Sequence, residues 1–379
     1  MPIFNRTKPT ISVTSGSDAY NFLAGTSGDD YVNADVALHN SDIYSLIFQL
    51  SSDLSSGRMM ADAQRAQGIL NNPTATANPH AFWMSMFAQL LLGGESFAYR
   101  WRNTNGQDLR WEYLRPSQVQ TYLLADGTGL IYNVSFDEPE IGMIESVPQQ
   151  DMIHFRLLSK NGGKTAISPL SALSSELQIK DQSNRLTLSA LARSIMAPGV
   201  LKIQHGGVLD ADQKARRSRQ FIKQTNESGN GPIVLDDLED YTPLQVQSNV
   251  AQLLNQVNWT SAQIAKVYGV SDSVLNGSGD QQSSLDMIGT DYVKSLSRFS
   301  NPIVSELNNK LNANVSLDLR PAVDPLGDSY ATSLSNLQKN GTLDSDQIDY
   351  LLRAYGYLPE ETPVMKGGET VDDESNDQG

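Results

Sequence analysis

The stretch from Gln263 to Leu311 constrains the fold of this chain more than any other. It starts with the end of one helix, crosses a polar loop rich in Gly, Ser and Asp, and enters a second, long helix. Pro302 lies inside that helix, and because proline lacks a backbone donor and clashes with the carbonyl four residues earlier, we expect a kink there. Apolar residues recur in the helix at spacings of three and four, the pattern of one buried stripe: Leu285, Ile288, Tyr292, Leu296, Phe299, Ile303, Leu307 and Leu311. A long bent helix with a polar loop at its start indicates a mechanical part, not a catalytic cluster.

Length and composition limit the class of protein. The 379 residues are enough for two or three compact units with their own cores. The chain has no cysteine, which excludes disulfides and thiolate metal sites. The N-terminus lacks the order of a signal peptide, and no apolar run approaches the roughly 20 residues that span a bilayer. We therefore expect a soluble protein made inside the cell, without a membrane partner.

The net charge of −15 bears on nucleic-acid binding. A protein that grips DNA by neutralising many phosphates needs clustered Lys and Arg, so the charge argues against that mode. It leaves open a protein that nucleic acid passes without sticking.

The first half of the chain predicts an α+β unit that ends near residue 165. Residues 1–36 are rich in Ser, Thr, Gly and Asp, and we expect a loosely held arm there. Helices are predicted at 37–57 and 80–92. Aromatic and β-branched runs separated by turn signals predict strands at 96–101, 109–114, 119–124, 131–136 and 152–158.

The second half predicts two helices that bracket a small αβ insert. Ser168 and Pro169 start one helix, which runs to about residue 196. The insert has predicted strands at 200–203 and 231–235 around a helix at 210–225, and a second long helix covers 250–268. After the bent helix, an alternating strand at 315–319 should return to the main sheet. A helical hairpin at 329–338 and 345–355 precedes residues 359–379, which are acidic, lack a hydrophobic pattern and are predicted to be disordered.

No pattern of catalytic residues stands out. Gly162 to Thr165 follow a strand and precede a helix, as a phosphate-binding loop would, but Leu158 occupies the place of the first glycine of that motif, so a surface turn is the better interpretation. His154 is interpreted as a structural histidine within a strand. The four histidines have no metal-site spacing, and we expect neither metal nor cofactor nor enzymatic activity. The alternative of an enzyme that uses the Gly162 to Thr165 turn predicts nucleotide binding.

One basic concentration lies inside the insert: Lys202, Lys214, Arg216, Arg217, Arg219 and Lys223. It is interpreted either as a solvated helix face or as a docking surface for phosphates or an acidic protein.

The order of short motifs along residues 37–358 resembles the portal (connector) family of tailed bacteriophages, in the compact form typical of long-tailed phages. The resemblance rests on several pieces, none of them specific alone: Asn72-Pro73 before the Phe82-Trp83 helix, the Gly94 to Tyr99 strand start, Leu114-Arg115-Pro116, Ile153 to Arg156, Ser168-Pro169-Leu170, Pro198 to Leu201, Ile264 to Val270 and Gly341-Thr342-Leu343. Two positions depart from the family, which usually has Asn in place of Glu95 and a Pro-Pro pair in place of Ser271-Asp272.

The resemblance implies a multi-domain α+β portal fold. After the N-terminal arm, residues 37–166 would form the first part of a sheet-and-helix wing, 167–196 and 246–270 two stem helices, and 197–245 the clip. Residues 271–284 would be a tunnel loop, 285–321 the kinked helix with a wing strand, and 322–358 a helical crown. The DNA-facing residues of the tunnel loop would be Asp272, Asn276, Gly277, Ser278, Gly279, Asp280, Gln281, Gln282 and Ser283.

The resemblance also implies partners and a place. Such a protein forms a ring, usually a dodecamer, at one capsid vertex of the virion, after assembly in the host cytoplasm. It passes double-stranded DNA during genome packaging and ejection, and it contacts the terminase large subunit, the head-tail adaptor, and the major capsid and scaffold proteins. The alternative is another ring-forming phage head-tail connector or structural protein without a DNA tunnel loop.

Overall fold

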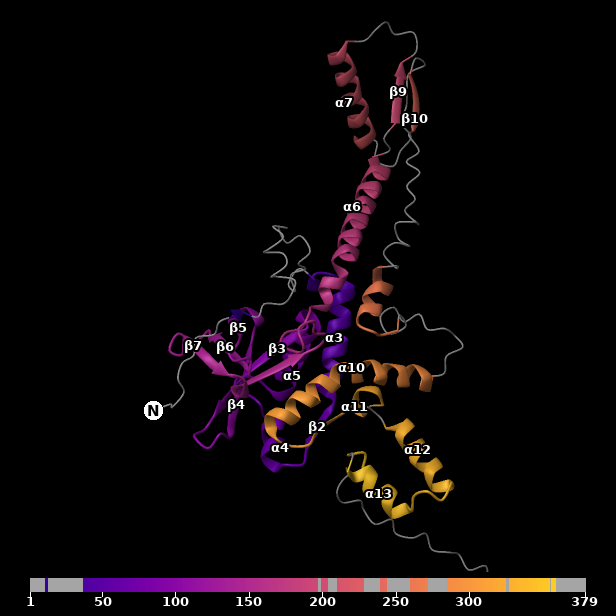
Figure 1. Ribbon diagram of the computed structural model, residues 1–379. Coiled ribbons are helices and arrows are strands. Elements are labelled where there is room, and N and C mark those ends of the chain that lie inside the picture. Colours follow the sequence, from indigo (N-terminus) through magenta and orange to yellow (C-terminus); the bar gives the residue numbers. More distant parts are fainter. Residues whose placement is uncertain are drawn as a thin grey trace, which may run out of the picture. The chain divides into compact units, whose positions relative to one another are not determined.

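The computed structural model describes residues 11–12, 37–196, 199–203, 210–227, 239–243, 260–271, 285–324, 327–354 and 356–358 (Figure 1). They fall into two compact units. Unit 1 comprises Met1–Gly25, Tyr44–Ser168 and Gly279–Gly379, and unit 2 comprises Thr26–Ile43 and Pro169–Ser278. Most of the predicted second stem helix and residues 272–284 of the predicted tunnel loop lie outside the described residues.

A three-stranded antiparallel sheet and one helix form the centre of unit 1. The strand order is β4 (Asp108–Leu114), β3 (Glu95–Arg102) and β8 (Met152–Arg156). Helix α5 (Pro79–Gly93) contacts β3 and β4. The Asn78 side chain caps this helix by accepting from Ala81 N at 2.8 Å, Pro79 starts it, and Gly94 ends it at φ 76°. The predicted helix at 80–92 and the three strands are therefore confirmed.

A second antiparallel sheet shares its core with the first. Its order is β1 (Ile11–Ser12), β5 (Val119–Leu123), β6 (Leu130–Ser135) and β7 (Met143–Pro148). Short 3₁₀ turns, η1 (Pro116–Gln118) and η2 (Gln149–Asp151), connect the strands. The sequence did not predict β7, whose alternation is weak, or β1, where two residues of the expected loose arm pair with β5. The shared core consists of Phe97, Leu114, Leu130, Tyr132, Val134, Phe136, Val147 and Met152.

A separate two-stranded ribbon corrects one expectation. The strand predicted at 315–319 is β11 (Val315–Asp318), but it pairs with β2 (Arg58–Ala61) and joins neither larger sheet. Residues 58–61 were not predicted to form a strand, so the main sheet was the only partner that the prediction offered for β11. β2 leads directly into α4 (Gln64–Asn71), which the sequence also missed because this eight-residue helix includes Gly68.

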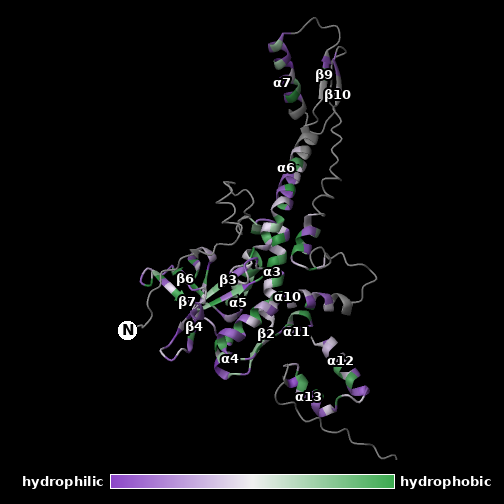
Figure 2. Ribbon diagram, viewed as in Figure 1, coloured by the Kyte–Doolittle hydropathy of each residue, from purple (hydrophilic) through white to green (hydrophobic). Residues whose placement is uncertain are grey.

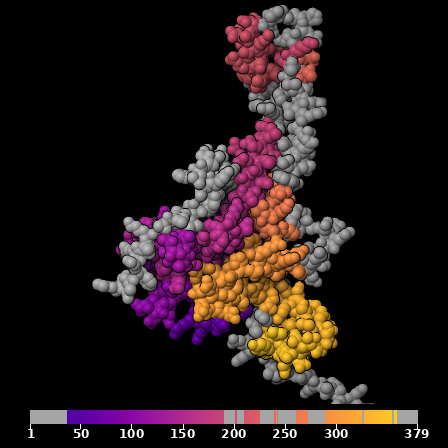
Figure 3. All heavy atoms as spheres, in the orientation of Figure 1, coloured from indigo at the N-terminus to yellow at the C-terminus, as the bar shows by residue number. Residues whose placement is uncertain are grey.

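The long helix predicted around Pro302 is α10 (Leu285–Leu311), and it is continuous on both sides of the proline. Leu296, Ile303 and Leu307 are fully buried, as the predicted stripe requires. Each buried side chain of this size contributes roughly 1.5–3 kcal/mol. The helix contacts β8, β11 and the short α11 (Arg320–Val323), and in Figure 3 its orange side chains lie against the purple residues of unit 1. The size of the kink at Pro302 stays a prediction.

Three further helices complete the described part of unit 1. Most of α3 (Ser41–Ser56) belongs to it, and Figure 2 shows hydrophobic residues along this helix, of which Leu46, Leu50 and Leu54 are fully buried. α12 (Asp328–Lys339) and α13 (Ser345–Ala354) contact each other and form the predicted helical hairpin.

Unit 2 contains the predicted stem and insert. The 3₁₀ turn η3 (Pro169–Leu173) leads into α6 (Ser174–Met196). The insert consists of β9 (Gly199–Ile203), α7 (Ala211–Glu227) and β10 (Glu239–Pro243), with β9 and β10 antiparallel. The strand predicted at 231–235 lies outside the described residues. Residues 260–267 are helical and bury Ile264 and Ala265.

Candidate functional site

The C-terminal half of α10 is attached to the central sheet of unit 1 through one carboxylate. Glu306 Oε2 lies 3.5 Å from Arg156 Nη2, and its Oε1 lies 3.4 Å from Lys310 Nζ. Oε1 also accepts from the backbone N–H of His154 at 3.4 Å, and Lys310 Nζ donates to the Gln149 carbonyl at 2.6 Å. The Lys310 and Glu306 side chains are only 5% and 11% exposed. A charge that is so deeply buried is costly without its partners, so this attachment fixes where the helix sits on the sheet.

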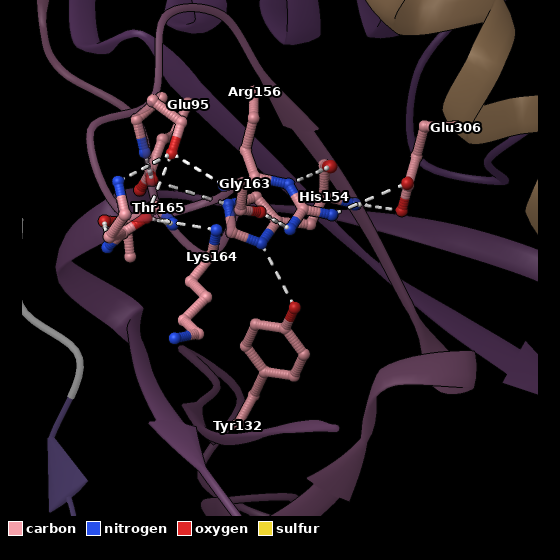
Figure 4. A network of polar contacts seen from close by, with 11 residues as sticks. Glu95, Tyr132, His154, Arg156, Gly163, Lys164, Thr165 and Glu306 are labelled. Atoms are coloured by element: carbon pink, nitrogen blue, oxygen red, sulfur yellow. Dashed lines mark hydrogen bonds and ion pairs between the residues drawn. The ribbon is translucent and has the colours of Figure 1, made fainter. Parts of the chain in front are cut away.

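His154 lies at the centre of the polar network in Figure 4 and is completely buried. Its Nδ1 is 3.1 Å from the Tyr132 hydroxyl, and its ring is tilted by 32° against that of Phe97, with centroids 4.3 Å apart. Nε2 lies 3.7 Å from Glu95 Oε1, beyond hydrogen-bond distance, because that oxygen accepts from the Ala166 N–H. Burial lowers the pKa of His154 more than Glu95 raises it, so the imidazole is neutral near pH 7. A buried, neutral ring of this kind fits the structural role predicted from the sequence.

The turn that follows β8 is not arranged to hold a phosphate. Asn161 Oδ1 accepts from the backbone N–H groups of Lys164 and Thr165 at 3.1 and 3.0 Å, and Ser159 Oγ accepts from Gly163 N at 2.9 Å. Arg156 donates to the Gly163 carbonyl (Figure 4). A phosphate loop needs such N–H groups to point at the ligand. Here they are used inside the turn, as the surface-turn interpretation requires.

The N-terminal half of α10 has a second polar attachment, to α3. The Tyr292 hydroxyl donates to Asp53 Oδ2. Burial and the neighbouring carboxylate raise the pKa of Tyr292, and burial raises the pKa of Asp53 although the tyrosine hydrogen bond opposes this. One helix is therefore held by polar contacts on both sides of Pro302.

In unit 2, Asp42 joins three segments. Its Oδ2 accepts from Lys180 Nζ on α6 at 2.7 Å and from the Ser261 hydroxyl of the 260–267 helix. Lys180 Nζ also donates to Asn40 Oδ1 at 3.2 Å. Burial acts to raise the pKa of Asp42, but the bonds from Lys180 and Ser261 hold it below its ordinary value. This carboxylate therefore connects the two predicted stem helices.

The six basic residues predicted as a docking surface do not all have the same role. Arg217 forms a two-bond ion pair with Glu239, which attaches α7 to β10 and lowers the pKa of that glutamate. Arg216, Arg219 and Lys223 follow spacings of three and four and are exposed, so they share one face of α7. Lys214 and Lys202 are exposed elsewhere on α7 and β9. The exposed residues Arg216, Arg219 and Lys223 are called the α7 basic stripe below.

Of the remaining predicted site residues, one lies in a described helix and the others do not lie in the described part of the chain. Pro302 lies inside α10. The nine residues predicted to face DNA fall outside the described residues: Asp272, Asn276, Gly277, Ser278, Gly279, Asp280, Gln281, Gln282 and Ser283.

The sequence interpretation missed the charged residues that hold the helices in place. Glu306 and Lys310 gave a usable signal, because they stand at i and i+4 beside the buried Ile303 and Leu307. Asp42 and Lys180 gave none, since 138 residues separate them. Within the described ranges, no group of His, Asp and Glu is arranged to hold a metal ion. No helix among the described residues is both long and apolar enough to cross a bilayer.

A family model and several solved structures match this chain. A family model described as phage portal protein matches residues 31–344. A chain from the neck of a native gene transfer agent particle, computed with C12 symmetry, matches with a TM-score of 0.66 and 15% identity, over 91% of this chain and 96% of that one. A neck chain of the empty particle, computed with C6 symmetry, gives 0.64 and 16%, over 85% and 94%. An HK97-family phage portal protein from Corynebacterium diphtheriae gives 0.56 and 13%, over 77% and 96%. Among curated proteins, none matches.

Proposed function

Because this chain belongs to the phage portal protein family, we propose that it forms a ring of twelve subunits at one capsid vertex, through which double-stranded DNA is packaged and later released. The observation that carries the proposal is the family match over most of the chain, supported by the likeness of its fold to neck chains from particles with ring symmetry. The role is structural. The parts are those expected from the family: a wing in unit 1, a stem and clip in unit 2, a tunnel loop at 271–284 and a crown at 322–358.

The exposed side chains of α6 support a ring. A closed ring uses head-to-tail contacts, so each subunit needs two different contact faces. Ile179 and Leu186 are 41% and 55% exposed and, being seven residues apart, lie on one side of α6. Leu188 is 67% exposed and points roughly 200° away from Leu186. A helix with apolar residues on two opposite sides can contact a neighbour on each side.

The charge of the chain supports passage of DNA without lasting attachment. Twelve copies carry 12 × −15 = −180 formal charges. The proposed tunnel loop contains neither Lys nor Arg between Asp272 and Ser284. Phosphates moving past such a surface meet few cations, so few counterions are released and binding is weak. The α7 basic stripe is proposed as the docking surface for the terminase large subunit and then for the head-tail adaptor.

Imaging of the purified protein tests the proposal. Twelve copies of a 41.5 kDa chain give 12 × 41.5 = 498 kDa, and views down the axis should show a central hole. Labelled copies should be found at a single capsid vertex. A compact globule without a hole under all assembly conditions, and no copies at a vertex, would contradict the proposal.

Shortening the loop separates the proposed function from the alternative of a ring without a tunnel loop. Removal of residues 277–282 should leave ring assembly intact and reduce DNA packaging or retention. Rings that lack these residues and still package normally would favour the alternative.

A further inference from the structure

A hollow in unit 1, called the basic hollow below, shares one residue, Lys310, with the contacts described above. Its volume is about 600 Å³, and α4, the β3–β4 hairpin and the last turn of α10 line it. Four cations line it, Arg65, Arg100, Arg102 and Lys310, and three of them are paired with carboxylates: Arg100 with Asp108, Arg102 with Asp151 and Lys310 with Glu306. Gly68 adds to the free space, because a methyl group placed on it would meet nothing within 4 Å.

The cations of the hollow are held in place to different degrees. Arg100 is 5% exposed and is fixed by two bonds to Asp108, at 2.9 and 2.7 Å, and one to the Gln150 carbonyl at 2.8 Å. Arg102 pairs with Asp151, yet its buried Nε has no hydrogen-bond partner among the described residues. Arg65 is exposed and forms no ion pair within the described part of the chain. The hollow therefore has a wall of paired arginines and, at its rim, an exposed cation that has no ion pair among the described residues.

The start of α4 adds a positive end to the same hollow. Ala63 occupies the N-cap position, where no side chain can accept from the first N–H groups of the helix, and Ala63 and Ala66 both line the hollow. Helix N-termini attract anions through these N–H groups and the helix dipole. Together with exposed Arg65 and the Nε of Arg102, which has no hydrogen-bond partner among the described residues, this favours an anionic occupant.

The chain itself contains a suitable anion within reach. Residues 359–379 hold seven acidic residues against Lys366 alone. They follow Gly356, where an added methyl would lie 2.8 Å from Arg58 Nη2, so Gly356 lies beside the start of β2. From Arg58 to Ala63 the extended chain covers about 17 Å. Twenty-one residues can extend up to roughly 70 Å, which is more than the separation requires.

We propose that the basic hollow binds carboxylates of the acidic segment 359–379 of the same chain. Two observations favour this segment as the occupant: its charge is opposite to that of the hollow, and it begins near β2, which leads into α4. A polar, acidic segment can be disordered alone and ordered when bound. The inference does not depend on the portal function, because it concerns contacts within one subunit.

Distance measurements between two spin labels test the proposal. The chain has no native cysteine, so Gln64→Cys beside the hollow and Ser375→Cys in the acidic segment give two unique labelling sites. We expect a population of short distances between the labels that disappears at high salt. It should persist when the labelled protein is diluted into an excess of unlabelled protein. Loss on dilution would mean that the segment binds another copy, which would overturn the proposal.

Charge reversal supplies the specific variant and its control. Arg65→Glu should reduce the short-distance population roughly fivefold, since one attraction is lost and one repulsion gained. Lys160→Glu, at an exposed residue of the same unit, makes the same charge change away from the hollow and should leave the population unaltered. Asp372→Asn, Asp373→Asn and Glu374→Gln together should reproduce the Arg65→Glu result. Equal effects of Arg65→Glu and Lys160→Glu would overturn the proposal, as would displacement of the segment by duplex DNA whose binding requires Arg65.

Discussion

At the scale of single residues, Gly94 is a position where unit 1 tolerates little change. It has φ +76°, and a Cβ there would lie 2.2 Å from the Ile167 carbonyl oxygen. Gly127 has nearly the same φ, +72°, but has open space around it. Gly127→Ala should therefore lower the free energy of unfolding only by the strain of placing alanine in the left-handed conformation, about 1–2 kcal/mol. Gly94→Ala should cost several kcal/mol more, because backbone atoms must move apart. Urea unfolding monitored by tryptophan fluorescence measures both, and equal losses would show that the clash is relieved without cost.

His154 gives unit 1 a dependence on pH with a definite sign. Burial holds its folded pKa below the ordinary 6.5, so below that pH the unfolded chain binds more protons than the folded one. The contribution of His154 to the free energy of unfolding is fully present above about pH 6.5. It is lost as the pH falls below that value, by at most about 1.4 kcal/mol per pH unit. Arg156, Glu95, Glu306 and Tyr132 surround the ring and remain unchanged in the His154 variant described next.

The variant His154→Gln isolates this contribution. Glutamine keeps a polar group near Tyr132 but does not titrate, so its stability should fall less between pH 7.5 and 5.5 than that of the wild type. Other carboxylates titrate equally in both proteins and cancel in the comparison. Parallel stability curves would mean that His154 has the same pKa in the folded and in the unfolded chain.

At the scale of elements, α10 depends on Glu306 for its position on the sheet. Glu306→Gln removes the charge that Arg156 and Lys310 share in a mostly buried place, and we expect a loss of about 2–4 kcal/mol in the free energy of unfolding. Asp291→Asn removes a charge from an exposed residue of the same helix and should change it by less than about 0.5 kcal/mol. Chemical denaturation of both variants measures the free energy of unfolding. If the two variants lose similar amounts, Glu306 does not hold α10 on the sheet.

The α7 basic stripe has its own prediction. Arg216→Glu with Arg219→Glu should weaken binding of the terminase large subunit about tenfold at low salt, and less at high salt, because exposed charges act mainly on association. Lys160→Glu with Lys339→Glu makes the same total charge change at exposed residues of unit 1. Arg217 is left intact so that α7 stays attached to Glu239. If binding is unchanged, or is weakened equally by both pairs of substitutions, the α7 basic stripe is a solvated helix face and not a docking surface.

The sequence predicts elements well where one local signal decides them. Asn78, Pro79 and Gly94 mark the ends of α5, and the spacing of Leu296, Ile303 and Leu307 gives the buried face of α10. It fails where the partner is distant in the chain. β11 was assigned to the wrong sheet because its partner β2 is only four residues long, and β10 was missed because acidic residues begin it.

The same limit applies to the candidate site. The basic residues of α7 are visible in the sequence, but the pairing of Arg217 with Glu239 depends on how the insert folds. Likewise the Gly162 to Thr165 turn resembles a phosphate loop in sequence, and only the bonds from Asn161 and Ser159 show that its N–H groups are already used.

At the scale of the whole molecule, the proposed ring should be sensitive to added positive charge at the tunnel loop. Gln281→Lys with Gln282→Lys adds two cations per subunit, which is 12 × 2 = 24 in a twelvefold ring. Each phosphate neutralised releases counterions, so DNA should be retained more strongly and the retention should fall steeply with salt. Asn105→Lys with Gln120→Lys adds the same charge at exposed residues of unit 1 and should leave DNA movement unchanged. Single-particle packaging rates at two salt concentrations measure the difference. If the loop lysines have no effect while rings form normally, DNA does not pass close to this loop, and weak contact between an acidic channel and DNA no longer explains the composition of the chain.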